Sequence, residues 1–268
     1  MMRISEPAPA KVNLALHVRG KLPDGRHALE TLFAFCVDGD KIEAEPADGI
    51  SLAVKGPFSA ELSTSNNLVL DAAQHLADAA GIDNGASLTL TKNLPVASGI
   101  GGGSADAGAT LRLLTRLWNI DPALASAVAP RLGSDVPACL LSMTARGVGA
   151  GDRLDLVQDP SIPGSPILLV NPLIALSTRD VFARWDGVDR GALGDWRNGR
   201  NDLEPPARAL VPEIGELLNW LSSRDGVTVA RMSGSGATCF ALFESEAARA
   251  RAADECPSNW WRLASILR

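Results

Sequence analysis

The sequence predicts an α+β protein in two halves, and three features lead to this class. Residues 8–18 and 86–92 alternate polar with apolar or small side chains, as strands do. The alanine-rich run from Pro122 to Arg131 is typical of a helix. Three prolines in residues 159–166 interrupt this mixture beyond the middle of the chain. Because strands and helices occur on both sides of the interruption, each half is expected to be α+β.

The first strand, at residues 8–18, has two unlike faces. Because side chains alternate across a strand, one face is apolar, with Val12, Leu14, Leu16 and Val18. The other face carries Lys11, Asn13 and His17. The strand is therefore expected to be half-buried, with a polar face. At this stage Lys11 has two interpretations, as an ordinary solvated lysine or as a functional cation.

A glycine-rich loop follows the strand at residues 86–92 and runs directly into a helix. Four glycines, Gly99 and Gly101 to Gly103, let the backbone adopt positive φ angles and turn successive N–H groups toward one point. Ser104 or Asp106 is expected to cap the helix. The helix carries an apolar stripe formed by Ala107, Leu111, Leu114 and Trp118. Its free N–H groups and positive dipole end attract anions, so the loop is predicted to bind phosphate.

Two better-known phosphate loops do not fit this segment. No lysine follows the glycines, which excludes the P-loop, and Ser104 stands where GxGxxG requires its third glycine. The alternative is a surface turn that ends a strand, but such a turn needs one or two glycines rather than four beside a helix. Within the helix, alanine in place of Gly108 would be favoured by roughly 1 kcal/mol.

Asp135 lies between the predicted ends of two helices. Gly133 is expected to end the helix that begins at Pro122. Asp135, two residues before Pro137, is expected to cap the next helix. Capping alone would explain an aspartate here, and catalysis is the other interpretation.

The second half begins with an apolar strand at residues 167–170. We predict an N-terminal domain over residues 1–158 and a C-terminal domain over residues 159–268. The irregular, polar segment 186–208, with Trp196 inside it, fits a mobile flap or a plain surface loop equally well. A glycine turn after Met232 leads into a β-rich run that ends at Phe243, which by itself indicates only a hairpin or a strand-to-strand turn.

Taken in order, the motifs resemble those of the GHMP kinases, the superfamily of galactokinase, homoserine kinase and mevalonate kinase. The segment that starts at Pro95 resembles their ATP-binding motif, and Gly133–Pro137 resembles the motif that carries their proposed general base. The turn after Met232 resembles a third motif, which closes over the substrate. The resemblance implies a two-lobed α+β fold with the active site in the interdomain cleft. It also implies phosphate transfer from ATP, with Mg²⁺, to an alcohol.

Within this superfamily, the sequence is most similar to the 4-diphosphocytidyl-2-C-methyl-D-erythritol kinases of non-mevalonate isoprenoid precursor biosynthesis. The triple glycine followed by Ser-x-Asp-Ala, and the segment Asn201–Glu204, resemble segments of these kinases. Residues 23–33 resemble their cytosine-binding segment, except that Arg26 stands where a tyrosine usually stacks on the base. A guanidinium plane can also stack on a base, so Arg26 either replaces that tyrosine or leaves the face open. His27 is then expected to hydrogen-bond the base, unless it is an ordinary turn histidine.

The resemblance implies a role for each candidate residue. Asp135 would accept the proton of the C2 hydroxyl, while Lys11 would pair with Asp135 and lower the effective pKa of that hydroxyl. The other substrate contacts would come from Asn13, Arg26, His27, Thr178 and Phe182. The ATP would be held by Lys92, Pro95, Val96, Ala97, Ser98, Gly99, Ile100, Gly101, Gly102, Gly103, Ser104 and Ala105. No side chain is expected to be a dedicated metal ligand.

Two other functions are compatible with the same motifs. A GHMP kinase for another small alcohol, such as homoserine or mevalonate, would not depend on a cytidine group, so competition by CMP or CDP separates the two kinases. A non-catalytic nucleotide-binding protein of this fold would be expected to lack the catalytic groups, yet Lys11 and Asp135 are both present.

Composition sets broad limits. The chain has 268 residues, of which 46% are hydrophobic and 21% charged, and a formal net charge of −6. This charge argues against a nucleic-acid polymer as partner, because such proteins show a basic stripe. Cys36, Cys139, Cys239 and Cys256 form no CxxC pair, which indicates isolated thiols in a reducing compartment. Without a signal peptide or an apolar run of about 18 residues, we expect a cytoplasmic monomer or weak homodimer with no membrane contact.

Overall fold

The computed structural model describes residues 3–63 and 67–268, and it confirms the mixed α+β class. Two compact units divide the chain. The first consists of the segment that ends at Ala10, Asp38–Val96 and Gly101–Ser142, and the second of Lys11–Val37, Ala97–Ile100 and Met143–Arg268. Each unit is thus assembled from three separate segments. The predicted division into an N-terminal domain over residues 1–158 and a C-terminal domain over residues 159–268 stays a prediction.

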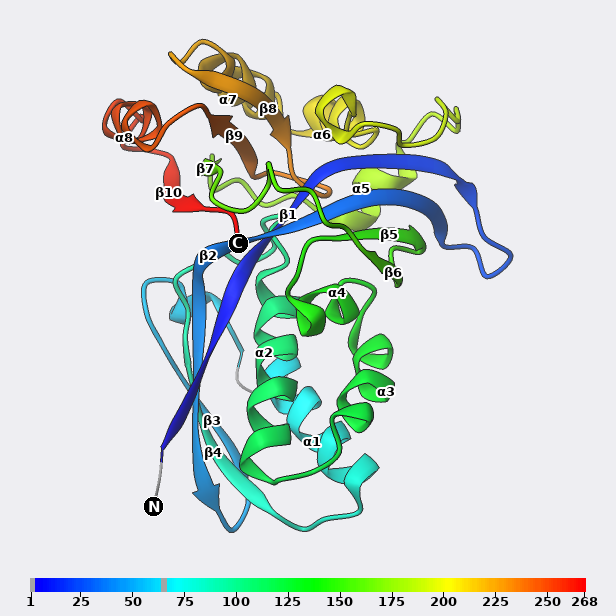
Figure 1. The fold of residues 1–268 in the computed structure, drawn as a ribbon, viewed down its shortest axis with the longest axis vertical. Coiled ribbons are helices and arrows are strands. Elements are labelled where there is room, and N and C mark those ends of the chain that lie inside the picture. Colours follow the sequence, from blue (N-terminus) through cyan, green and yellow to red (C-terminus); the bar gives the residue numbers. More distant parts are fainter. Residues whose placement is uncertain (1–2, 64–66) are drawn as a thin grey trace. The chain divides into compact units, whose positions relative to one another are not determined.

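In the first unit, four helices accompany a small sheet (Figure 1). Strand β3 (Ile50–Lys55) runs parallel to β4 (Gly85–Thr91), and β4 pairs antiparallel with the second half of β2 (His27–Ala47). The helices are α1 (Leu68–Ala80), α2 (Gly102–Leu117), α3 (Pro122–Leu132) and α4 (Val136–Leu141), and a 3₁₀ turn, η1, covers Ser59–Glu61. The predicted strand at residues 86–92 and the predicted helix from Pro122 are confirmed, each to within one residue.

Helix α2 is central to this unit, because α1, α3 and α4 all pack against it. The predicted apolar stripe is confirmed, since Ala107, Leu111 and Leu114 are fully buried and Trp118 nearly so. Gly108, however, faces the backbone of α4. A Cβ atom at this position would lie 2.7 Å from the carbonyl carbon of Cys139 and 2.8 Å from the nitrogen of Leu140. The expected benefit of alanine at position 108 is therefore wrong, because two helix backbones approach each other there.

We expect Gly108→Ala to lower the free energy of unfolding by about 1–3 kcal/mol, because overpacking against backbone atoms outweighs the gain in helix propensity. Urea unfolding of the purified protein measures this change. Gly103→Ala is the matched control in the same helix, since its Cβ would meet only the Cδ1 of Leu68, at 3.4 Å. A Gly108→Ala variant as stable as the Gly103→Ala variant would contradict the packing argument.

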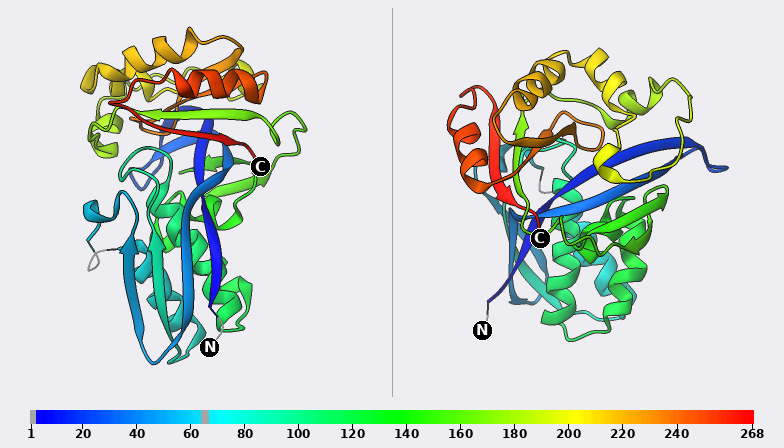
Figure 2. Two further views of the ribbon diagram at one scale, coloured as in Figure 1. Left: turned by 90° about the vertical axis from the view of Figure 1, so that its left-hand side faces the viewer. Right: turned by 45° about the horizontal axis from the view of Figure 1, so that its top comes forward.

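The second unit contains two groups of strands. Leu29–Phe33 of β2 pairs antiparallel with β5 (Ala145–Gly149), which pairs in turn with β6 (Arg153–Leu156). The other group is an antiparallel sheet in the order β10-β7-β9-β8, formed by β7 (Pro166–Asn171), β8 (Val227–Met232), β9 (Cys239–Phe243) and β10 (Trp261–Ile266). Its helices are α5 (Thr178–Ala183), α6 (Glu204–Leu210), α7 (Glu213–Ser222) and α8 (Glu246–Asp254), with a 3₁₀ turn, η2, at Trp196–Asn198. Figure 2 shows α7 and α8 on one face of the four-stranded sheet.

The core of the second unit lies between that sheet and its helices. Leu168 and Val170 of β7 pack in one cluster with Leu217 and Leu221 of α7 and Phe243 of β9. The predicted strand at residues 167–170 is confirmed as part of β7. Over the described ranges, none of the helices has the length and apolar character required to cross a membrane.

The first strand, β1 (Ile4–Lys21), confirms the prediction of a strand but not of a half-buried one. Lys11 and His17 are each only 2% exposed and Asn13 only 3%. Both faces of the strand are therefore covered at these positions. Buried polar side chains need hydrogen-bond partners, and the partners of these three define much of the candidate site.

Candidate active site

The glycine loop between β4 and α2 has the strained backbone that its sequence requires. The φ angle is positive at Ala97 (50°), Gly99 (76°) and Gly101 (66°). Gly101 occupies the cap position of α2 and offers no side-chain cap, so the predicted capping by Ser104 or Asp106 is wrong. Both residues lie inside the helix, whose first hydrogen bond runs from the nitrogen of Ala105 to the oxygen of Gly101. The N–H groups ahead of Ala105 precede this ladder and remain the natural donors for an anion.

Part of this loop packs against the glycine turn between β8 and β9. That turn is a hairpin, with Met232 opposite Cys239. The Ser233 hydroxyl donates to the oxygen of Gly99 (3.1 Å), and the nitrogen of Thr238 donates to the oxygen of Ser98 (3.2 Å). A Cβ atom on Gly99 would lie 2.5 Å from the oxygen of Gly236. Two of the motifs identified in the sequence are thus in direct contact, and glycine at position 99 is needed for it.

Lys11 and Asn13 lie together on the buried face of β1. The Nζ atom of Lys11 donates to Oδ1 of Asn13 (2.7 Å), and Nδ2 of Asn13 donates to the hydroxyl of Thr31 (2.8 Å). That hydroxyl in turn donates to the oxygen of Ala15 (2.7 Å). Lys11 is therefore not a solvated surface lysine. The chain of hydrogen bonds fixes the direction in which its ammonium group is presented.

Asp135 takes the cap position of α4, but its side chain makes no capping hydrogen bond. The side chain is half-buried. Capping by the carboxylate therefore does not account for an aspartate at this position. Asp135 and Lys11 belong to different units, and their predicted pairing stays a prediction.

Lys92 is not the available cation that the sequence suggested. Its side chain is buried, with Nζ 2.5 Å from Oδ2 of Asp40 and 2.8 Å from Oδ2 of Asp106. Burial works against its charge, but the carboxylates of Asp106 and Asp40 prevail and raise the pKa of Lys92. The ammonium group of Lys92 thus forms ion pairs with two buried carboxylates. Its predicted contact with ATP stays a prediction.

Aromatic side chains gather around His27. Its ring stacks on Phe182, with centroids 4.7 Å apart and an interplanar angle of 29°. Trp185 meets the same ring edge-on, at 5.6 Å. Burial, and then the nearby charge of Lys21, lower the pKa of His27, so the ring is neutral at pH 7 and carries one donor and one acceptor nitrogen. The structure therefore brings together two of the predicted substrate-binding residues, His27 and Phe182.

The other two substrate candidates lie differently. The hydroxyl of Thr178 is hydrogen-bonded to that of Ser235 in the glycine turn (2.8 Å). Arg26 is exposed, and its guanidinium group contacts Asp24 (2.8 Å) and Asp152 (3.2 Å). Neither contact involves an aromatic ring.

Sequence reasoning missed several residues of this region. Trp185 lies three positions after Phe182, just beyond the end of α5, and gave no signal except that it is a second aromatic residue close in sequence. Asp106 was noticed only as a helix cap. Asp40 gave no local signal, since its partner Lys92 lies 52 positions further along the chain.

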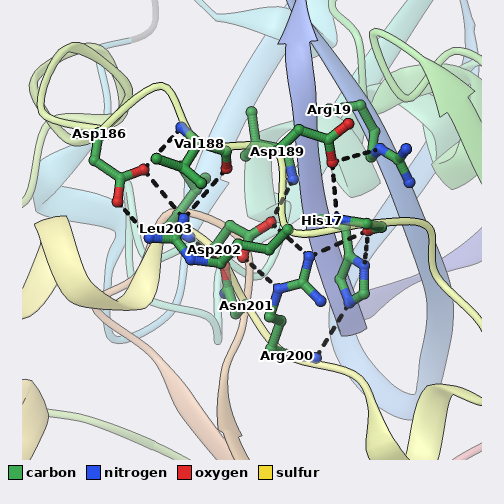
Figure 3. Close-up of polar contacts among 12 residues, drawn as sticks. His17, Arg19, Asp186, Val188, Asp189, Arg200, Asn201, Asp202 and Leu203 are labelled. Atoms are coloured by element: carbon green, nitrogen blue, oxygen red, sulfur yellow. Dashed lines mark hydrogen bonds and ion pairs between the residues drawn. The ribbon is translucent and has the colours of Figure 1, made fainter.

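The irregular segment 186–208 is tied to β1 through His17 (Figure 3). The Nδ1 atom of His17 lies 3.1 Å from the oxygen of Gly191, and Nε2 accepts from the nitrogen of Arg200 (3.4 Å). Arg200 also donates to Asp202 (2.6 Å), whose other carboxylate oxygen accepts from the nitrogen of Val18 (2.8 Å). This pattern requires neutral His17 with its proton on Nδ1. The choice between a flap and a plain loop stays open.

We expect the protein to lose stability below about pH 6.5, in part because of His17. Burial lowers the pKa of His17. Between its ordinary pKa and this lower one, the unfolded chain binds a proton that the folded protein does not, so unfolding is favoured as the pH falls. The loss is at most about 1.4 kcal/mol per pH unit. Urea unfolding at pH 7.5 and 5.5 measures it, and His17→Gln should show a smaller difference. Equal pH dependence in both proteins would contradict this role.

Comparison with known proteins gives consistent matches along the chain. The model of the GHMP kinases N-terminal domain matches residues 67–143, and the model described as GHMP kinases C terminal matches residues 182–262. The 4-diphosphocytidyl-2-C-methyl-D-erythritol kinase of Rhizorhabdus wittichii is 50% identical over 100% of this chain and 96% of its own. The enzyme of the same name from Novosphingobium aromaticivorans is 48% identical over 100% of this chain and 94% of its own.

Solved structures agree with these matches. A crystal structure of 4-(cytidine 5'-diphospho)-2C-methyl-D-erythritol kinase superposes with a TM-score of 0.82 and 33% identity, over 99% of each chain. A homoserine kinase from Cytophaga hutchinsonii superposes with a TM-score of 0.70 over 99% of this chain and 95% of its own, at 18% identity. The second likeness shows the shared fold alone.

Proposed function

Because this chain belongs to the 4-diphosphocytidyl-2-C-methyl-D-erythritol kinase family of the GHMP kinases, we propose that it phosphorylates the C2 hydroxyl of that alcohol with ATP. The products are ADP and the 2-phosphate. The observation that carries this proposal is 50% identity to a relative of that name along the whole chain. The aromatic pair of His27 and Phe182 supports a planar base as part of the substrate. The reaction belongs to non-mevalonate isoprenoid precursor biosynthesis. We also propose that the enzyme acts in the cytoplasm.

In the proposed mechanism, the glycine loop holds the ATP phosphates on backbone N–H groups. Phosphoryl transfer depends on in-line positioning and on charge neutralisation more than on covalent chemistry. Mg²⁺ would supply part of that neutralisation at the ATP phosphates, with Ser104 as its neighbour. Asp135 accepts the proton of the C2 hydroxyl as the oxygen attacks the γ-phosphorus. Lys11, held in direction by Asn13, supplies positive charge beside the developing alkoxide.

The cytosine is proposed to contact His27 and Phe182. A neutral His27 can exchange one donor and one acceptor with the edge of the base, while Phe182 offers a flat apolar face. Asn13 and Thr178 are proposed to contact the rest of the alcohol. Its hydroxyl groups are matched by the amide and hydroxyl of these two side chains.

Arg26 is expected to contribute a modest stacking contact with the base. Because its present ion pairs are exposed, they cost little to rearrange. Arg26→Ala should then raise KM for the cytidine substrate about two- to fivefold, the equivalent of an exposed cation–π contact of about 0.5–1 kcal/mol, and Arg26→Tyr should restore it. Steady-state kinetics measure both. Unchanged KM in both variants would mean that position 26 does not touch the base.

A kinase for another small alcohol is the main alternative. It predicts that CMP and CDP do not compete with the acceptor, whereas our proposal predicts competition by both. If the protein binds nucleotide without catalysing a reaction, we expect tight ATP binding and no turnover.

The proposal is tested by incubating the purified protein with ATP and the diphosphocytidyl alcohol and examining the product by ³¹P and ¹³C NMR. We expect one new phosphate monoester, coupled to C2. A phosphate on another carbon, or on none, would overturn the proposed reaction.

A further inference from the structure

A buried cluster of three charges lies at the base of the glycine loop. Lys92 follows β4, Asp106 lies in the second turn of α2, and Asp40 belongs to β2. All three are at most 2% exposed, and Nζ of Lys92 lies 2.5 Å from Asp40 and 2.8 Å from Asp106. The cluster therefore connects the residue that enters the loop with the helix that leaves it.

The two carboxylates of the cluster are not equally satisfied. Asp40 uses both oxygens, because Oδ1 accepts from the nitrogens of Asn93 (2.5 Å) and Leu94 (2.9 Å) while Oδ2 faces Lys92. Asp106 uses only Oδ2, and its buried Oδ1 has no hydrogen-bond partner among the described residues. A buried carboxylate oxygen without a donor is costly as an anion. If one carboxylate takes up a proton, it is therefore Asp106.

Few other charges act on Asp106 in the described part of the chain. Helices α1, α3 and α4 pack on α2, and their buried residues are all apolar: Val69, Ala72, Ala73, Leu76, Ala77, Ala125, Val128, Ala129, Val136, Ala138 and Cys139. The next cation along α2, Arg112, is paired with Glu6 (2.6 Å). Lys92 and Asp40 thus dominate the charge around Asp106.

The cluster also lies close to the backbone that faces the phosphates. A Cβ atom on Gly102, the first residue of α2, would be 3.0 Å from Nζ of Lys92. With both carboxylates ionised, two negative charges and one positive charge leave the cluster at net −1 beneath a loop that must hold a polyanion. One added proton makes it neutral.

We propose that nucleotide binding at the glycine loop is coupled to protonation of Asp106, which takes a proton from solvent as the phosphates arrive and returns it on release. Burial, and to a smaller extent the charge of Asp40, raise the pKa of Asp106 to about 7 against the attraction of Lys92. Phosphate charge nearby raises it further, so uptake occurs near neutral pH and affinity falls as the pH rises. Asp106 is a positioning residue here, and the inference rests on the proposed nucleotide-binding role of the loop.

Calorimetric titration with ADP, in buffers of different ionisation enthalpy, measures the protons taken up. At pH 7.5 the wild type should take up more protons per ADP than Asp106→Asn, which keeps an oxygen for Lys92 but cannot be protonated. ADP's own proton exchange is common to both proteins, so the difference belongs to Asp106. Between pH 6.5 and 8.5 the wild type should also lose more affinity than the variant, by up to about tenfold per pH unit.

Asp83→Asn is the matched control, because Asp83 is exposed in the turn between α1 and β4 of the same unit. It should behave like the wild type. If Asp106→Asn fails to fold, ¹³C NMR of aspartate carboxyls in the wild type provides the same test, since one buried carboxyl should shift toward its protonated position when ADP is added at pH 7. Equal proton uptake in wild type and variant, or an unmoved carboxyl, overturns the coupling alone. Absence of ADP binding overturns the nucleotide site as well.

Discussion

Asp135→Asn is expected to lower kcat by about 10²–10⁴-fold, the contribution of a positioned general base. The amide has the shape of the carboxylate but cannot accept the hydroxyl proton. Because the side chain makes no capping hydrogen bond, the substitution does not remove a cap from α4. Affinity for ATP should also change little, since the phosphates are held by backbone N–H groups. Steady-state kinetics, with nucleotide binding measured separately, distinguish these effects.

Asp121→Asn is the control for this substitution. Asp121 occupies the cap position of α3 in the same unit, and its Oδ1 accepts from the nitrogen of Ala123 (2.8 Å). Asparagine caps a helix about as well as aspartate, so both stability and kcat should be retained. A kcat for Asp135→Asn within a few-fold of this control would remove Asp135 from the mechanism.

Lys92→Met is expected to lower the free energy of unfolding by about 3–5 kcal/mol, because it leaves Asp40 and Asp106 buried without their shared cation. Denaturant unfolding measures the loss. Lys55→Met is the matched control, since Lys55 ends the neighbouring strand β3 and its ion pair with Glu43 (3.2 Å) is exposed. This control should lose less than about 1 kcal/mol.

A second substitution identifies the cause of the loss. Adding Asp106→Asn to Lys92→Met removes the cost of burying that carboxyl without its cation, so it should restore part of the stability. A double variant that is less stable than Lys92→Met would mean that Lys92 acts by filling space and not through its charge.

Local patterns predicted the main elements well. The strand before the glycine loop, the apolar stripe of α2 and the helix from Pro122 all depend on short-range periodicity, which the sequence displays directly. The pattern of β1 was harder to interpret. Period-two alternation shows that Lys11, Asn13 and His17 share a face, but it cannot show whether solvent or protein covers that face.

Long-range contacts account for most of the remaining differences. From the sequence alone, Gly108 is expected to weaken its helix. The structure shows that the backbone of α4 lies beside it, so glycine is required there. From the sequence alone, Lys92 is expected to be a free cation. The structure shows that its ammonium group is paired with Asp40 and Asp106. In both cases the decisive partner lies more than ten positions away, and no local propensity reports it.

In the candidate site, too, the sequence predicted individual residues, whereas the contacts between distant segments became visible only in the structure. Residues of the glycine loop, His27 and Phe182 were predicted from the family resemblance, and the structure places His27 against Phe182. The hydrogen-bonded series from Lys11 through Asn13 to Thr31 joins β1 to β2, and only the register of those strands reveals it.

The most direct test of the proposed function compares acceptors in one coupled ADP-release assay. The diphosphocytidyl alcohol, homoserine and mevalonate are each supplied with ATP and Mg²⁺ at equal concentration. We predict ADP release with the diphosphocytidyl alcohol only, and inhibition of that release by CDP. Equal or faster release with homoserine or mevalonate, or no release with the diphosphocytidyl alcohol, would contradict the proposed function.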